Sequence, residues 1–186
     1  MNYNWIGNYS YFRQRISPDK EAVYDLDRNS KYSYYELDNR ANILANYMTN
    51  EMNIKKGDRI AYISRNGIEL IDGYYATGKI GAIFVPYNMR LSAKELGQLI
   101  NKETPSVLFY EEIFQEKIDE LKEICDIKYY VVIRESIGEK LNNSNIEYEK
   151  IMEYSDNSPA FCEDLDLEDI HLIIHTGGTT GLPKGA

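Results

Sequence analysis

The sequence predicts an α/β fold, a mostly parallel sheet flanked by helices on both faces. Short runs rich in branched and aromatic residues alternate along the chain with segments of helical periodicity. Hydrophobic residues make up 43% and charged residues 27% of the chain, which is ordinary globular usage. At 186 residues the chain is long enough for one compact core. We therefore expect residues 1–186 to form a single α/β domain.

An opening hairpin and a first helix are expected near the start of the chain. The runs 21–26 and 31–34 have strand character, and the turn residues 27–30 join them. Ser33 and Glu36 have the spacing of a capping box, which predicts a helix beginning there. Five apolar residues then share one helical face: Leu37, Ala41, Leu44, Ala45 and Met48.

Three more helices are expected further along. One begins after Asn66 and ends at Gly81, and another begins at a second capping box of Ser92 and Glu95. The fourth spans residues 111–125, where Phe114, Ile118, Leu121 and Cys125 fall on one side.

Five strands are expected between and after these helices, at residues 59–64, 82–85, 106–110, 128–133 and 170–175. Strands that alternate with helices predict right-handed crossovers and a parallel sheet covered on both faces. We expect the last strand to be buried. Residues 138–158, rich in Asn, Ser and Glu, are expected to form a loop or an irregular region.

The charge of the chain argues against a nucleic acid partner. Its net charge is −9, and no basic cluster is longer than Lys55–Lys56. Cys125 and Cys162 lack metal or redox spacing and are expected to be buried thiols in a reducing compartment. The sequence shows neither a secretory signal nor an apolar stretch of transmembrane length, so we expect a cytoplasmic protein without a transmembrane segment.

The last segment, HTGGTTGLPKGA, has the composition of a phosphate-binding loop. Its glycines can take positive φ and let backbone amides approach a ligand, while its threonines and lysine add donors and positive charge. The P-loop of nucleoside triphosphatases requires Gly-Lys-Ser/Thr, and here Pro183 precedes Lys184 and Gly185 follows it. The segment therefore predicts a phosphate cradle of another kind.

TGGTTGLPKG resembles the phosphate-binding signature of the adenylate-forming superfamily of AMP-dependent synthetases and ligases, most closely that of the fatty acyl-CoA synthetases. The stretches 32–48, 54–96 and 163–170 resemble the opening region of that family in order and spacing. The resemblance implies activation of a small carboxylic acid with ATP and Mg²⁺, followed by transfer to coenzyme A. The residues that match the family's cofactor-binding motif, and so imply contacts with the β- and γ-phosphates, are Thr176, Gly177, Gly178, Thr179, Thr180, Gly181 and Lys184.

Two departures from the family accompany this resemblance. Gly177 stands where many members have Ser, so a hydroxyl donor is missing. The family's adenine contacts, acyl pocket, hinge and catalytic lysine all follow this loop. The chain is thus expected to be an N-terminal fragment that lacks the C-terminal domain and holds no catalytic residue. Alone it is expected neither to form acyl-adenylate nor to bind ATP tightly.

Other interpretations remain open. The enzyme could adenylate an amino acid or an aryl acid, or the chain could be a non-catalytic module that binds a nucleotide or a partner. His171 is expected to be a satisfied structural histidine, and His175 to pack against or orient the loop. The acidic residues Asp164, Asp166, Glu168 and Asp169 are expected to form a solvated linker, since the spacing of a calcium loop is incomplete.

Overall fold

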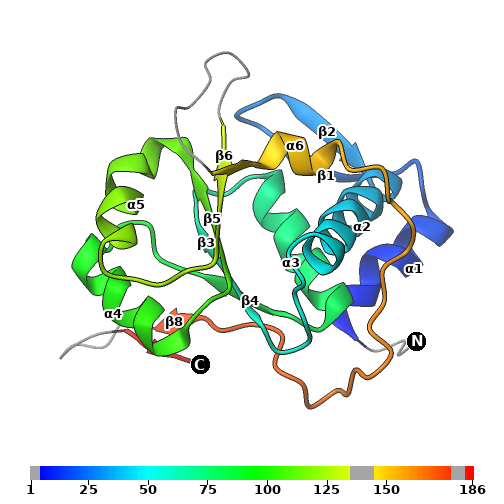
Figure 1. The fold of residues 1–186 in the computed structure, drawn as a ribbon. Helices are drawn as coiled ribbons and strands as arrows, with labels where there is room; N and C mark the ends of the chain where they lie inside the picture. The colour runs from blue at the N-terminus through cyan, green and yellow to red at the C-terminus, as the bar shows by residue number, and fades with distance from the viewer. Residues whose placement is uncertain (1–4, 135–144, 177–182) are drawn as a thin grey trace.

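The centre of the molecule is a five-stranded parallel sheet (Figure 1). The computed structural model describes residues 5–134, 145–176 and 183–186. In spatial order the strands are β4 (Ile83–Pro86), β3 (Arg59–Ile63), β5 (Val107–Glu111), β6 (Tyr129–Ile133) and β7 (Ile146–Glu147). Every neighbouring pair is parallel. The predicted parallel sheet is confirmed.

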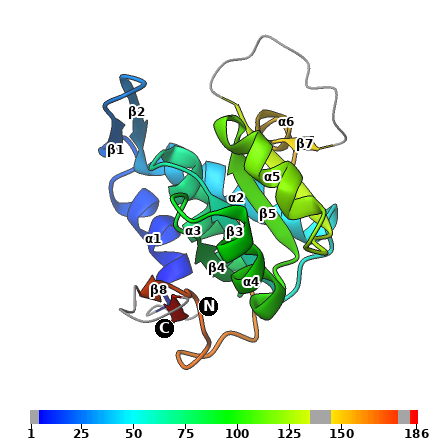
Figure 2. The same cartoon turned by 90° about the vertical axis from the view of Figure 1, so that its left-hand side faces the viewer.

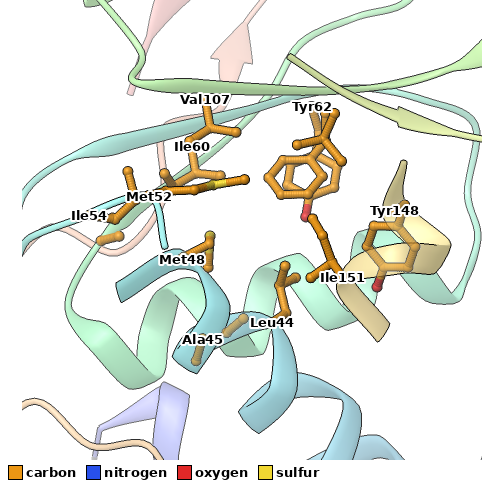
Figure 3. Packing of buried hydrophobic residues seen from close by; sticks show 14 of the residues in the cluster. Leu44, Ala45, Met48, Met52, Ile54, Ile60, Tyr62, Val107, Tyr148 and Ile151 are labelled. Carbon is orange, nitrogen blue, oxygen red and sulfur yellow. The ribbon is translucent and has the colours of Figure 1, made fainter. Parts of the chain in front are cut away.

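Helices cover both faces of this sheet (Figures 1 and 2). The helices α2 (Tyr34–Asn50), α3 (Ile68–Ile80) and α6 (Tyr148–Met152) pack on one face, and α4 (Ala93–Glu103) and α5 (Gln115–Lys122) pack on the other. Alternation along β3 explains the two cores: Tyr62 faces α2 and α3, whereas Ala61 and Ile63 face α4 and α5. Figure 3 shows Leu44 and Met48 of α2 packed toward β3.

The predicted helix boundaries are set by local signals. Glu36 N donates to Ser33 Oγ at 3.2 Å, and Ser33 N donates to Glu36 Oε2 at 2.7 Å, which confirms the first capping box. The box of Ser92 and Glu95 is formed in the same way. Helix α3 ends at Gly81, whose φ of +71° suits glycine. The predicted helix at 111–125 is shorter, because Glu112–Phe114 form a 3-10 turn, η2, before α5.

The opening hairpin is confirmed as β1 (Glu21–Asp25) paired antiparallel with β2 (Ser30–Ser33). Two elements that the sequence does not predict precede it: the 3-10 turn η1 (Ile6–Asn8) and the helix α1 (Tyr9–Ile16). The turn η1 packs beside α3, where Trp5 Nε1 donates to Gly78 O at 2.6 Å, and α1 packs beside α2. The N-terminal segment is therefore part of the packed body.

The expectation of a loop or irregular region at 138–158 is wrong for residues 146–152, whereas residues 153–158 are irregular as expected. Residues 145–158 contain β7 and α6, and Tyr148 and Ile151 are buried against the sheet. Tyr148 Oη donates to Asp72 Oδ2 at 2.6 Å, which ties α6 to α3. Elements of two and five residues are too short to show a period, so their burial depends on contacts far away in the sequence.

The expectation of a buried strand at 170–175 is also wrong. Leu172 forms a single parallel bridge to Phe84 of β4, while Ile170 is 61% and Ile174 50% exposed. The segment lies at the outer edge of β4, where no further strand covers it within the described residues. It continues into a small antiparallel hairpin of β8 (His175–Thr176) and β9 (Lys184–Gly185).

Two smaller expectations can be compared with the structure. Cys125 and Cys162 are free thiols, but they are half-buried rather than buried. None of the helices in the described part of the chain combines the length and the apolar character needed to cross a bilayer.

Candidate phosphate-binding hairpin

The hairpin of β8 and β9 carries two of the seven predicted phosphate contacts. Thr176 pairs with Lys184, and His175 pairs with Gly185. Thr176 Oγ1 also donates to Lys184 O at 3.3 Å, and both residues are exposed. The other five, Gly177, Gly178, Thr179, Thr180 and Gly181, lie outside the described residues. The structure thus brings the two ends of the predicted loop opposite each other.

Backbone hydrogen bonds fix this hairpin to the edge of the sheet. Phe84 N donates to His171 O at 2.8 Å, and Ile173 N donates to Phe84 O at 3.0 Å. Ile174 and Ala186 exchange two further backbone bonds, at 3.0 and 2.9 Å. The bridge between Leu172 and Phe84 is parallel, so the chain leaves this segment past the carboxyl end of β4. This is the edge at which open α/β sheets bind ligands.

A cluster of three side chains lies under the hairpin. His175 Nε2 is 2.7 Å from Glu103 Oε1, and Tyr87 Oη donates to Glu103 Oε2 at 2.8 Å. The Tyr87 and His175 rings lie 5.2 Å apart between centroids. Burial and the bond to Glu103 raise the pKa of Tyr87, so its hydroxyl stays protonated and donates. The expected packing of His175 agrees with these contacts, whereas the sequence gives no signal for Glu103.

The end of α4 that presents Glu103 is itself held by β3. Arg59 Nε donates to Glu103 O at 2.7 Å, and Arg59 Nη2 donates to Thr104 Oγ1 at 2.9 Å and to Thr104 O at 3.1 Å. Thr104 has a φ of +48°, a conformation uncommon for a residue other than glycine. The guanidinium group therefore satisfies carbonyls that the helix leaves free at its C-terminus.

His171 has a different environment, and the expectation that it is satisfied is wrong. Its ring packs against Tyr74 at 4.6 Å and Trp5 at 5.8 Å, and neither ring nitrogen has a hydrogen-bond partner among the described residues. Burial lowers the pKa of His171 to about 4. This side chain fills an aromatic cage at the base of the segment and is not placed for proton transfer at the hairpin.

The acidic stretch before the hairpin is tied to the body by Lys56. Lys56 Nζ lies 2.6 Å from Asp169 Oδ2 and donates to Asp164 O at 2.5 Å. The bond from Lys56 lowers the pKa of Asp169. No group of three or more His, Cys, Asp or Glu residues that could hold a metal occurs in the described ranges. Asp164, Asp166 and Glu168 are exposed, which agrees with the expected solvated linker.

Two buried charged clusters hold the helices together away from the hairpin. Lys79 Nζ lies 2.7 Å from Asp38 Oδ1, which also accepts from Ser10 Oγ at 2.6 Å. Arg40 Nη2 lies 2.7 Å from Asp72 Oδ2. Because these groups join α1, α2 and α3 and are fully or largely buried, we assign them a structural role.

A polar crevice of about 520 Å³, separate from the hairpin, opens at the carboxyl ends of β3 and β5. Three carboxylates and two guanidinium groups line it, together with Asn66: Asp25, Asp27, Glu111, Arg28 and Arg65. Arg65 Nε lies 2.7 Å from Glu111, and Arg28 Nη1 lies 2.5 Å from Glu69. The excess of carboxylates makes this crevice a poor site for a triphosphate.

The chain belongs to the AMP-binding enzyme family, whose match covers residues 12–186. A 3-oxocholest-4-en-26-oate–CoA ligase of Rhodococcus rhodochrous is 34% identical over 173 residues, which are 91% of this chain and 30% of that protein. A feruloyl-CoA synthase of Amycolatopsis sp is 29% identical over 186 residues, 100% of this chain and 33% of that protein. The chain thus spans about a third of the length of these relatives.

Solved structures have the same fold. The anthranilate CoA ligase AuaEII, in complex with anthranoyl-AMP, superposes with a TM-score of 0.86 at 20% identity, over 96% of this chain and 33% of that one. The N-terminal domain of FACL13 from Mycobacterium tuberculosis superposes with a TM-score of 0.82 at 25% identity, over 97% of this chain and 43% of that one. The parallel sheet with helices on both faces is therefore the N-terminal architecture of adenylate-forming enzymes.

Proposed function

We propose that this chain is the N-terminal part of an ATP-dependent, AMP-forming carboxylate–CoA ligase. The observation that carries the proposal is the hairpin that holds Thr176 opposite Lys184 at the carboxyl edge of the sheet, in a chain of the AMP-binding family. Several converging donors at this position would favour the terminal phosphates of ATP, because hydrogen bonds to charged groups contribute about 1.5–3 kcal/mol each.

The proposed reaction has two halves. In the first, a carboxylate oxygen attacks the α-phosphorus of ATP, which gives acyl-adenylate and releases pyrophosphate. In the second, the thiol of coenzyme A attacks the acyl carbon, which gives the thioester and releases AMP. Thr176, Lys184 and the five loop residues between them would hold the leaving pyrophosphate. Mg²⁺ would arrive with ATP and share its charge, since no carboxylate belongs to the proposed loop.

The substrate class is proposed from the relatives. Their names specify a steroid acid, ferulate and, for FadD13 of Mycobacterium tuberculosis, long-chain fatty acids. A fatty or other organic acid is therefore our first choice for this protein, and an aryl or amino acid is the alternative. The acyl pocket is proposed to lie in the part of the enzyme that follows this region.

The test is carboxylate-dependent exchange of labelled pyrophosphate into ATP by the complete protein that contains this chain. A panel of fatty, aryl and amino acids should reveal at least one that supports exchange. Lys184→Ala should slow that exchange by about tenfold or more, the size of one lost contact with a charged group. Lys94→Ala, an exposed lysine on α4, serves as the control. Absence of exchange with every acid would refute the proposal.

The proposal also covers the extent of the domain. We propose that residues 1–186 form one domain of a cytoplasmic enzyme whose C-terminal domain is not in this chain, and that the 186 residues alone do not catalyse exchange. Reading the DNA past the codon for Ala186 separates this from a non-catalytic nucleotide- or partner-binding module. A continuing frame of the same family favours the enzyme, and a natural stop favours the module.

A further inference from the structure

Glu103 connects three elements that are distant in the sequence. It is the last residue of α4, and its two carboxylate oxygens contact Tyr87, just after β4, and His175, the first residue of β8. The His175 and Glu103 side chains are only 3% and 12% exposed. In Figure 1, β8 lies beside α4 at the lower edge of the sheet, consistent with this contact.

We propose that Glu103 is a positioning residue for the first half-reaction: with Tyr87 and His175 it anchors the base of the hairpin, and so sets where the loop meets the terminal phosphates. The inference rests on the proposed function and adds to it a residue that lies outside the Gly/Thr/Lys motif.

The geometry suits a carboxylate at this position. Tyr87 donates its hydroxyl to one carboxylate oxygen, and His175 donates to the other when its tautomer carries the proton on Nε2. Only an acidic side chain presents two acceptor oxygens to such a pair. Nδ1 of His175 has no partner in the described part of the chain. The ring orientation therefore depends on the bond at Nε2 and on the contact with the Tyr87 ring.

Both strands of the hairpin lie close to this anchor. A Cβ atom built on Gly185 of β9 would lie 3.4 Å from Glu103 Oε1 and 2.8 Å from Ile173 Cγ2. Gly185 of β9 thus lies near the carboxylate, while β8 is held through His175. Because residues 177–182 connect these strands, a shift of the base would move the loop at both of its ends.

The two half-reactions should respond differently to loss of the anchor. Only the first half involves the β- and γ-phosphates, so a misplaced loop slows adenylate formation. The second half starts from bound acyl-adenylate and has no triphosphate to hold. A purely structural role would instead lower both halves together through loss of folded protein.

The experiment compares Glu103→Ala and Glu103→Gln with the neighbouring Lys102→Ala in the complete protein. Lys102 is exposed and lies one residue earlier on α4. We expect Glu103→Ala to slow pyrophosphate exchange by about tenfold to a hundredfold, as a small misplacement of reacting groups does. Glu103→Gln should be intermediate because it keeps one acceptor oxygen, and Lys102→Ala should match the wild type. Formation of acyl-CoA from supplied acyl-adenylate should stay within about twofold in all of them.

Several outcomes would overturn the inference. Wild-type exchange rates in Glu103→Ala, or an equal loss in both half-reactions, would exclude a positioning role. If Glu103→Ala fails to fold, Glu103→Gln and Tyr87→Phe provide the same comparison.

The ¹⁵N shifts of His175 give a readout without catalysis: Nε2 should be protonated in the wild type, and an unprotonated Nε2 would contradict the anchor. A wild-type protein without exchange would refute the proposed function instead, while the NMR test of the anchor would still stand.

Discussion

The two ends of the segment from His171 to His175 are held by opposite kinds of contact. At the start, His171 packs between Trp5 and Tyr74, and its ring has no hydrogen-bond partner among the described residues. At the end, His175 is hydrogen-bonded to Glu103, and its ring lies beside the ring of Tyr87 at a tilt of 30°. The same residue type, four positions apart, serves as an aromatic filler in one place and as a polar anchor in the other.

This difference teaches that the role of each histidine is set by its distant partners. Glu103 is 72 positions from His175 in the sequence, and Trp5 lies at the other end of the chain from His171. At the apolar end, stability should depend on the volume of the side chains and little on their hydrogen-bonding groups. The polar end should respond to the loss of single donors or acceptors.

The largest effect is expected at the apolar end, from Trp5→Ala. Trp5 is 4% exposed, and its removal leaves a cavity beside His171 and deletes the bond to Gly78 O. We expect a loss of about 3–5 kcal/mol in the free energy of unfolding, measured by denaturant titration. Ile16→Ala, at a side chain 73% exposed in the same N-terminal region, should cost less than about 0.5 kcal/mol. Similar losses in both variants would contradict the cage.

The second prediction uses pH to sharpen the contrast. The pKa of His171 is lowered to about 4 in the folded protein, so below its unfolded value of 6.5 the unfolded chain binds a proton that the native chain does not. Stability is therefore lost as pH falls from 6.5 to 4, by about 3 kcal/mol from this group.

His171→Phe keeps an aromatic ring in the cage and removes the titration. Between pH 6.5 and 4, the free energy of unfolding of this variant should fall by about 3 kcal/mol less than that of the wild type. Parallel pH profiles for the two proteins would show that His171 is not buried in its neutral form.

The third and smallest effect is expected at the polar end. Tyr87→Phe removes one donor to Glu103 without changing the ring, and should cost about 1–2 kcal/mol in the free energy of unfolding. Tyr24→Phe is a matched control, because the Tyr24 hydroxyl bonds to Asn29 on the exposed hairpin. Equal costs for the two variants would mean that the Tyr87–Glu103 bond does not stabilise the fold.

Local signals in the sequence predict much of this fold. The capping boxes at Ser33 and Ser92 and the glycine stop at Gly81 depend on residues within one turn, and each is confirmed. The central strands are predicted because parallel strands buried on both faces are rich in branched and aromatic residues.

The misses at α6 and at residues 170–175 involve long-range contacts. Helix α6 has five residues and owes its burial to partners such as Asp72, 76 positions from Tyr148. The run 170–175 is apolar like a central strand but lies at an edge. Of the candidate site, the motif identifies the loop, whereas the anchor at Glu103 comes from the end of another helix and has no local signature.

The most direct measurement is a crystal structure of the complete protein with a non-hydrolysable ATP analogue. We expect the β- and γ-phosphates to lie against the loop between Thr176 and Lys184, with Lys184 Nζ in contact with a phosphate oxygen and Glu103 still hydrogen-bonded to His175. A triphosphate bound elsewhere, such as in the crevice of Arg28 and Arg65, would contradict it.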